Sequence, residues 1–545
     1  MGGLLFLDAI GLDGSSLYMH YVHALQVLIF VAVTLSVLVA ADRFLHVVQY
    51  LYWKSQRSLR NKRPEDAFAF ADLPCMYTYG HLYPQVAVQL PMFNERAVCQ
   101  QIIDCACELA WPERAVYVQV LDDSTDKATR DLVDEKVCEW KERGRKIDVV
   151  RRTNRKGYKA GAMKEGMELL GGYDYIAVFD ADFKPQSDFL YQTIPYMQGN
   201  ADVGYVQTRW VFANPNESFL TKAQQISLNF HVKCEQYVHF ALGSFFNFNG
   251  TAGVWRKACI QSAGGWDART TVEDMDLSLR AHLKGWRAIY LKDVTCINEL
   301  PSSFFAYRKQ QHRWCCGPMQ LWIKASRDIW RSSIPIHKKL YLNLCYFGIR
   351  KFGTHLVTLG FFCTLVPLSI FTPEVRVPFW ALVYLPIVVA MSTAAFTKRG
   401  WLHCVIYVLF ENAMGIVRLW AVISGLLNLK RAQEWVVTTK FGSSDARPST
   451  GSNAAKVPDV RSCKLYTGEF VMSIFVLFAA VYGIFAVQRW DFSIFLSLQG
   501  LAFLAFGLNL VDMDSILGKF ESKSRQAPAG ESEMPELRRT KTTPF

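Results

Sequence analysis

The feature of this sequence that most constrains its fold is a set of apolar windows close to the length of about 20 residues that an α-helix needs to cross a bilayer. The first window, residues 22–41, contains no Asp, Glu, Lys or Arg. It is not typical of a cleaved signal peptide, because the residues before it carry Asp8 and Asp13 and no Lys or Arg. The sequence therefore predicts an integral membrane protein, with an extracytosolic segment at 1–21 and a transmembrane helix at 22–41.

The distribution of basic residues predicts the orientation. Residues 52–63, "YWKSQRSLRNKR", are rich in Lys and Arg, which marks the cytoplasmic side of a span. Segment 401–427 carries Glu411, Asn412 and Arg418, which are costly inside a bilayer, so we expect an interfacial helix there and another at the basic segment 336–352. Including the first helix, this gives five spans, the other four lying at 353–371, 378–396, 469–487 and 492–511.

Between the first two spans, residues 42–335 have the composition of a soluble α/β domain. Helix-like stretches separate short apolar runs that are typical of buried strands. This alternation predicts a parallel sheet with right-handed crossovers, in which ligands bind beyond the carboxyl ends of the strands. The strand-like runs lie at 85–91, 115–123, 146–152 and 175–182.

Carboxylates follow two of these predicted strands. Asp122 and Asp123 end the second run, and Asp180 and Asp182 end the fourth, so all four should lie at one edge of the sheet. Converging carboxylates favour a hard cation, Mg²⁺ or Mn²⁺, whose coordination a nucleoside diphosphate would complete. The alternative is that these residues only cap helices and turns.

Two later segments add the groups that sugar transfer requires. Residues 270–286 open a predicted helix with Glu273, Asp274 and Asp276, which could simply reflect the helix dipole. Residues 308–320 supply a glutamine, an arginine and a tryptophan that could be ordinary surface packing. Taken with the strand-end carboxylates, they provide a base for a hydroxyl, charge for a leaving diphosphate and an aromatic face for a sugar.

In order along the chain, the motifs "PMFNE", "LDDSTD", "RKGYKAGAM", "FDADF", "VQTRW", "FNFNGTAGVWR", "TVEDMDL" and "QQHRW" resemble those of the processive family 2 glycosyltransferases. Within that family they are most similar to the cellulose synthase-like A and C group of plants and green algae. The resemblance spans roughly residues 20–515. It implies a cytosolic α/β domain of the GT-A (Rossmann-like) type joined to an α-helical transmembrane bundle, in a multi-pass membrane protein.

The resemblance also implies roles for the donor-side residues. Asp122, Asp123 and Lys159 would contact the nucleotide-sugar donor. Asp180 and Asp182 would hold the divalent metal, with Asp180 also close to the donor diphosphate.

On the acceptor side, Asp274 would be the catalytic base that takes the proton of the acceptor's 4-hydroxyl, although Val272 stands where the family motif shows Thr. Gln310, Arg313 and Trp314 match the family's QxxRW motif, with the arginine near the diphosphate and the tryptophan under the terminal acceptor sugar. The reaction would invert the anomeric carbon by direct displacement.

A further motif, "EWVVTTKFG" at 434–442, resembles the family's gating loop, with Thr438 and Lys440 at the substrate and Trp435 replacing Phe. The alternative is an amphipathic linker. We place a gating loop and linker at 430–460 and a disordered tail at 518–545.

The resulting hypothesis is a Golgi-membrane synthase that polymerises a β-1,4-linked mannan or glucomannan from GDP-mannose and translocates it across the membrane. A β-1,4-glucan synthase using UDP-glucose, or use of GDP-glucose, is left open. Beyond the donor, the expected partners are the growing β-1,4-glycan and membrane lipid, with no nucleic acid. A transporter with a nucleotide-binding domain would not explain the Asp274 and QxxRW motifs, and no GxGxxG turn supports a dehydrogenase.

Overall fold

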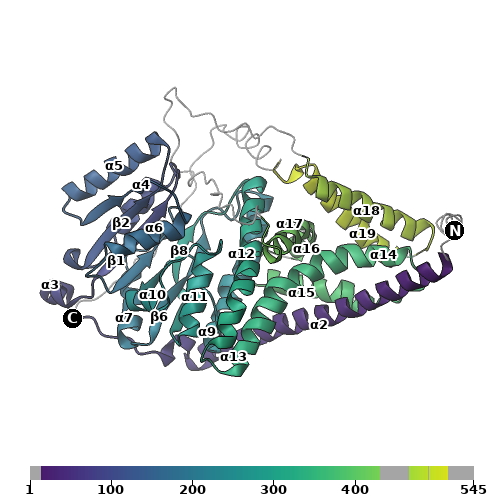
Figure 1. The fold of residues 1–545 in the computed structure, drawn as a ribbon, viewed down its shortest axis with the longest axis horizontal. Helices are drawn as coiled ribbons and strands as arrows, with labels where there is room; N and C mark the ends of the chain where they lie inside the picture. Colours follow the sequence, from purple (N-terminus) through teal and green to yellow (C-terminus); the bar gives the residue numbers. More distant parts are fainter. Residues whose placement is uncertain (1–13, 400, 430–464, 489, 513–545) are drawn as a thin grey trace, which may run out of the picture.

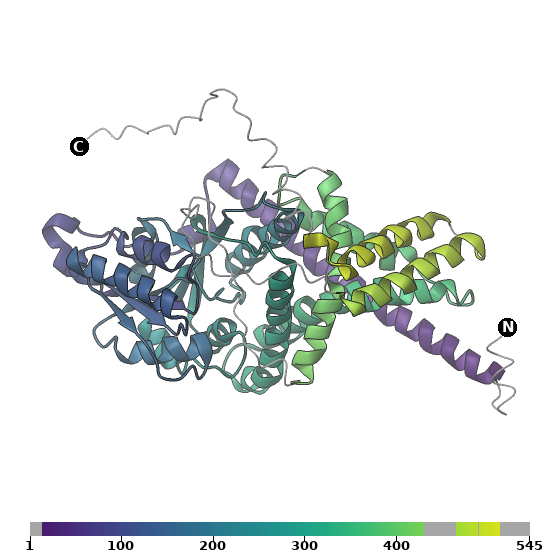
Figure 2. The ribbon, with the colours of Figure 1, turned by 90° about the horizontal axis from the view of Figure 1, so that it is seen from above.

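The computed structural model describes residues 14–399, 401–429, 465–488 and 490–512. An α/β domain lies at one end of the molecule and apolar helices at the other, with the long helix α12 (Phe304–Arg331) between them (Figure 1). Helix α2 (Gly14–Arg60) runs from the apolar end toward the α/β domain, and its N-terminal part extends beside the other helices (Figure 2).

The α/β domain is built on one eight-stranded sheet of order β3-β2-β1-β4-β7-β6-β8-β5. Every residue of β1, β2 and β4 is buried, as expected for strands covered on both faces. The strands are β1 (Val86–Met92), β2 (Val116–Asp122), β3 (Ile147–Val150), β4 (Tyr175–Val178), β5 (Lys184–Pro185), β6 (Val203–Phe212), β7 (Gly253–Arg256) and β8 (Arg287–Asn298).

The first four strands are parallel, as predicted, but the prediction of a wholly parallel sheet is wrong. Strand β7 inserts between β4 and β6 and is antiparallel to both, and β5 is antiparallel to β8. The physical reason is the path of the chain. Residues 247–252 lie beside the carboxyl end of β4, where the amide of Ala252 donates to the carbonyl of Val178, and β7 then runs back along β4.

Helices cover the sheet, and most connect consecutive strands. Short turns also occur at η1 (Pro64–Ala67), η2 (Gly80–Leu82) and η3 (Glu113–Ala115). The helices of this domain are α3 (Met76–Tyr79), α4 (Cys99–Cys107), α5 (Lys127–Glu142), α6 (Tyr158–Glu168), α7 (Phe189–Gly199), α8 (Phe219–Phe230), η4 (His231–Glu235), α9 (Gln236–Ala241), α10 (Lys257–Ser262) and α11 (Glu273–Leu283).

The apolar end consists of α2 and the helical segments that follow α12. Helices α18 and α19 lie side by side (Figure 2). The segments after α12 are α13 (Ile336–Leu340), η5 (Tyr341–Gly353), η6 (Leu356–Leu365), α14 (Val366–Ile370), η7 (Trp380–Tyr384), α15 (Leu385–Ala394), α16 (Trp401–Ala413), α17 (Gly415–Leu426), α18 (Thr467–Phe485), α19 (Trp490–Gly507) and η9 (Leu510–Asp512).

Within the described residues, three helical stretches are long and apolar enough to cross a membrane: Ser16–Arg60, Leu402–Leu426 and Thr467–Phe485. A fourth exists if Ile336–Gly353 and Leu356–Ile370, which meet at 45°, form one bent span. The five-span arrangement and the interfacial placement of 401–427 stay predictions. Two predicted segments, residues 430–460 and 518–545, lie outside the described residues, as do residues 1–13 of the predicted N-terminal segment 1–21.

Buried ion pairs attach α12 to the apolar helices. The guanidinium of Arg308 on α12 pairs with Glu469 of α18, whose side chain is almost fully buried. On α17, Arg418 pairs with Glu411 of α16 and donates from Nε to Gln311 of α12, at 3.0 Å. Since a charge is costly to bury unless it is paired, these contacts fix α12 against the apolar end.

Candidate active site

A cavity of about 170 Å³ opens at the carboxyl edge of the sheet, where the strand-end rule predicts a ligand site. Strands β1 and β2, the segment that follows β4, helices α6 and α12, and the N-terminus of α11 all contribute to its wall. Of the predicted site residues, the cavity brings together Asp123, Lys159, Asp180, Asp182, Asp274, Gln310, Arg313 and Trp314.

Lys159 and Asp180 form a close ion pair in the cavity wall. Lys159 Nζ lies 2.5 Å from Asp180 Oδ1 and donates to the carbonyl of Gly250 at 2.9 Å. The backbone amide of Asp180 donates to Thr251 Oγ1. Although burial acts to lower it, the pKa of Lys159 is raised by Asp180 and then by Glu273, so the ammonium keeps its charge.

Asp274 lies at the start of α11, and its environment makes it an unusually basic carboxylate. Burial, and next the neighbouring Glu273, raise the pKa of Asp274 to about 7, while Lys159 acts in the opposite direction. Asp274 Oδ1 accepts from the amide of Met275 at 2.7 Å. A carboxylate with a pKa near neutrality is suited to accept a proton in a general-base step.

Acidic groups outnumber basic groups around this cavity. Seven acidic side chains line it against the basic Arg155, Lys159 and Arg313. An anionic nucleotide would be repelled by this excess unless a cation entered with it. The acidic residues are Glu95, Asp123, Asp180, Asp182, Glu273, Asp274 and Glu299.

The residues present fit a Mg²⁺ or Mn²⁺ ion carried by a diphosphate. Asp180 and Asp182 offer two carboxylates at the end of β4, and no group of three or more Asp, Glu, His or Cys among the described residues is arranged to hold a metal. Such ions commonly take one or two protein carboxylates and complete their coordination with phosphate oxygens and water.

The two aspartates at the end of β2 are placed differently. Asp123 lines the cavity and is held by Arg152, whose Nε donates to Asp123 Oδ1 at 2.9 Å. Asp122 is fully buried, accepts from the amide of Ser124 and from Arg151 Nε, and is not part of the cavity wall. In the described structure Asp122 therefore shapes the loop, while Asp123 faces the ligand space.

The QxxRW residues lie at i, i+3 and i+4 on one face of α12, and all three line the cavity. The helix begins at Ser303, whose hydroxyl accepts from the amide of Ala306. Burial lowers the pKa of Arg313, although Glu273 and Asp180 act in the opposite direction. Thr438 and Lys440 lie outside the described residues.

The lining residues to which the sequence assigned no role include three polar side chains, Arg155, Asn249 and Glu299. Glu299 follows β8 directly, so the strand-end rule that found Asp180 would also have found it. Asn249 belongs to the "FNFNG" motif, but only the antiparallel return of β7 brings that motif to the cavity.

A second, larger cavity of about 360 Å³ adjoins the first. It shares Asn249, Asp274 and Trp314 with the first cavity and is bounded by residues of α2, η5, α15, α16 and α17. The ligand space therefore continues from the carboxyl edge of the sheet toward the apolar helices.

A match to a protein-family model agrees with this geometry. The model described as "Glycosyltransferase like family 2" matches residues 84–317, which include the sheet and the first part of α12. The matched segment has the GT-A glycosyltransferase fold, built here on a mixed sheet.

Two curated relatives show which kind of glycosyltransferase this chain resembles. A probable glucomannan 4-β-mannosyltransferase 11 of Oryza sativa subsp. japonica is 43% identical over 79% of this chain and 79% of its own length. Glucomannan 4-β-mannosyltransferase 9 of Arabidopsis thaliana is 39% identical over 90% of this chain and 92% of its own length. The chain belongs to this glucomannan 4-β-mannosyltransferase family, the cellulose synthase-like A group.

Among solved structures, a mannosyltransferase from Pyrobaculum calidifontis in complex with GDP-Man and Mn²⁺ is similar with a TM-score of 0.44 and 20% sequence identity. The match covers 73% of this chain and 100% of the other.

Proposed function

We propose that this protein transfers mannose from GDP-mannose to the 4-hydroxyl of a growing β-1,4-linked mannan or glucomannan. The observation that carries the proposal is that three groups converge in one acid-rich cavity. These are Asp274, whose pKa is raised to about 7, the Lys159–Asp180 ion pair, and Arg313. The curated relatives, which are glucomannan 4-β-mannosyltransferases by name, support the choice of sugar.

On the donor side, Asp180 and Asp182 would hold Mg²⁺ or Mn²⁺, which when bound neutralises charge on the leaving diphosphate. Lys159 and Arg313 would add positive charge beside the same diphosphate. Asp123 would face the nucleoside, and Asp122 would support that end of the site through its bonds to Ser124 and Arg151.

On the acceptor side, Asp274 would take the proton of the 4-hydroxyl as its oxygen attacks the anomeric carbon. One bond forms to that carbon as its bond to the diphosphate oxygen breaks, so the configuration inverts without a glycosyl-enzyme intermediate. Trp314 would stack on the terminal sugar, with Gln310 beside it. The rate enhancement would rest on positioning and electrostatics.

The second cavity supports processive synthesis with translocation. A glycan whose end lies at Asp274 could extend into this cavity, because both cavities share Asn249, Asp274 and Trp314. We place the protein in the Golgi membrane, with the α/β domain in the cytosol, and assign Thr438 and Lys440 to contacts with the donor. Protection of the α/β domain from protease in sealed Golgi vesicles would contradict this orientation.

The test is to incubate membranes that contain the protein with Mg²⁺ or Mn²⁺ and radiolabelled GDP-mannose or UDP-glucose. Any polymer is then digested with linkage-specific mannanase and glucanase. We expect a mannanase-sensitive product from GDP-mannose. A polymer made only from UDP-glucose and cut only by glucanase would contradict the proposal and favour a glucan synthase.

A further inference from the structure

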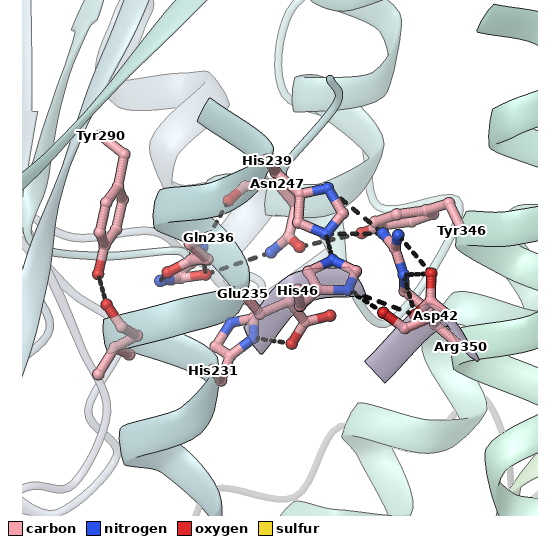
Figure 3. A network of polar contacts seen from close by, with 12 residues as sticks. Asp42, His46, His231, Glu235, Gln236, His239, Asn247, Tyr290, Tyr346 and Arg350 are labelled. Atoms are coloured by element: carbon pink, nitrogen blue, oxygen red, sulfur yellow. Dashed lines mark hydrogen bonds and ion pairs between the residues drawn. The ribbon is translucent and has the colours of Figure 1, made fainter. Parts of the chain in front are cut away.

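Apart from the active site, a buried group of polar side chains joins three segments that lie far apart in the sequence. Asp42 and His46 belong to α2, His239 to α9, and Tyr341 and Arg350 to η5. We call these five residues the interhelix cluster. Figure 3 shows Asp42, His46 and Arg350 meeting around His239.

The charged part of the cluster joins α2 to η5. Arg350 donates to both carboxylate oxygens of Asp42, with Nη2–Oδ1 and Nε–Oδ2 distances of 2.8 Å, and to Tyr341 Oη at 2.8 Å. The Arg350 and Asp42 side chains are only 10% and 19% exposed. Because either charge would be costly to leave alone in this environment, the pair fixes the position of η5 along α2.

The two histidines join α9 to the same pair. His46 Nδ1 lies 2.6 Å from the carbonyl of Asp42, so this nitrogen carries the hydrogen and Nε2 of the neutral ring is an acceptor. Burial, and next Arg350, hold the pKa of His239 well below its usual range, with His46 and Lys351 acting in the same direction and Glu235 against it. His239 is therefore neutral.

A neutral His239 has two hydrogen-bonded arrangements. Its Nε2 atom lies 2.6 Å from Arg350 Nη1 and 3.0 Å from His46 Nε2. It can accept from the arginine or donate to His46, but one nitrogen cannot do both. Helix α9 thus stays attached to η5 or to α2 in either arrangement.

The same two segments, α9 and η5, hold the loop that ends at the active site. Gln236, one helical turn before His239, exchanges two amide hydrogen bonds with Asn249, at 2.8 and 2.9 Å. From η5, Tyr346 Oη donates to Asn247 Oδ1 at 3.0 Å. Figure 3 shows Gln236, Asn247 and Tyr346 beside the interhelix cluster.

The loop in turn contacts the catalytic groups. The carbonyl of Gly250 accepts from Lys159 Nζ, and a Cβ atom added to Gly250 would lie 2.9 Å from Asp274 Oδ2. A shift of residues 247–250 would therefore displace Lys159 or press on Asp274. Asp42, His46 and Arg350 also line the second cavity together with Asn249.

We propose that the interhelix cluster is a positioning device, which holds residues 247–250 against Lys159 and Asp274 and so couples α2 to the mannosyl-transfer site. The proposal rests on the proposed function, because it assigns a cause for the placement of the base. A glycan in the second cavity would contact both the cluster and Asn249. Its movement through the cavity would therefore affect the positions of Lys159 and Asp274.

The sharpest variant is Tyr346→Phe, which removes only the hydroxyl that binds Asn247. We expect kcat to fall roughly three- to tenfold, the size of a lost hydrogen bond, with an unchanged KM for GDP-mannose. Lys159 lowers the pKa of Asp274, so its displacement should move the acid limb of the pH–rate profile to higher pH. Asp42→Asn should change both quantities further in the same directions.

The matched control is Tyr83→Phe, which removes a hydroxyl that donates to the carbonyl of Pro74 at 2.7 Å, outside the cluster and the loop. It should leave kcat and the pH profile unchanged. Hydrogen–deuterium exchange of residues 247–250 should rise in Tyr346→Phe and Asp42→Asn, but not in the control.

The coupling would be overturned if folded Tyr346→Phe and Asp42→Asn kept the wild-type kcat, pH profile and hydrogen–deuterium exchange. Hydrogen–deuterium exchange is measured without a donor, so it tests the coupling independently of the proposed function. The proposed function would be contradicted if the wild-type protein made no mannan.

Discussion

Carboxylates are buried in both halves of the molecule, but their surroundings differ. In the apolar helices, Glu411 and Glu469 each have an arginine partner, Arg418 and Arg308. In the active-site cavity, seven acidic side chains face three basic ones. The first arrangement pairs each carboxylate with an arginine and fastens α12, whereas the second gives the cavity more acidic than basic side chains, which favours binding of a cation. Similar residues thus serve structure in one region and chemistry in the other.

The largest effect should follow removal of the divalent cation, which tests the role of the acid-rich active-site cavity. Chelation should lower mannosyl transfer by at least about a hundredfold, because the charge of the diphosphate would no longer be balanced. Added Mn²⁺ or Mg²⁺ should restore the rate, and Asp182→Asn should require a higher metal concentration. Full transfer in the presence of chelator would show that Lys159 and Arg313 suffice.

The role of the buried ion pairs in the apolar helices is tested by Glu469→Gln, which leaves Arg308 without its carboxylate partner. Removing one partner of a buried pair costs about 3–5 kcal/mol, so thermal unfolding in detergent should occur at a clearly lower temperature. The exposed pair Arg287–Asp202 provides the control, because Asp202→Asn should cost no more than about 1 kcal/mol. Equal effects of the two variants would refute a structural role for the buried pair.

A smaller effect should come from Gly250→Ala. The residue has a φ of +82°, and its new Cβ would meet Asp274 Oδ2 at 2.9 Å. A left-handed alanine costs about 1–2 kcal/mol, so kcat should fall roughly 5- to 30-fold if the strain acts on the base. Gly171→Ala, where a Cβ would meet nothing within 4 Å, should keep the wild-type rate.

A further prediction needs no substitution. A base must be deprotonated to act, and Asp274 has its pKa raised to about 7. The transfer rate should therefore be half-maximal near pH 7, reach a plateau above it, and fall about tenfold per pH unit below it. A profile that stays flat down to pH 5 would mean that no group with the raised pKa of Asp274 controls the rate.

Sequence patterns were most informative where one physical rule applied locally. Asp123 and Asp180 follow the strands β2 and β4, and the parallel half of the sheet brings the ends of those strands together. The rule could not show that Asp122 turns inward to Arg151, because neighbouring residues at a strand end point in different directions.

The rest depended on contacts between distant segments. No local pattern reveals that β7 runs antiparallel between β4 and β6, and that path brings Asn249 and Gly250 to the base. The Arg350–Asp42 pair joins residues 308 positions apart, so only the folded chain shows it. Length and composition likewise cannot decide whether 401–427 crosses a membrane, because its charged residues Glu411 and Arg418 satisfy each other.

The most direct test of the account is the rate of mannosyl transfer by Asp274→Asn, measured with binding of GDP-mannose and with Asp148→Asn, a change at an exposed site, as control. Asparagine preserves the shape of the side chain but cannot take the proton. We predict a loss of roughly 10²- to 10⁴-fold in kcat with donor binding retained, and no loss in the control. A folded Asp274→Asn protein that builds mannan at the wild-type rate would contradict the assignment of the base.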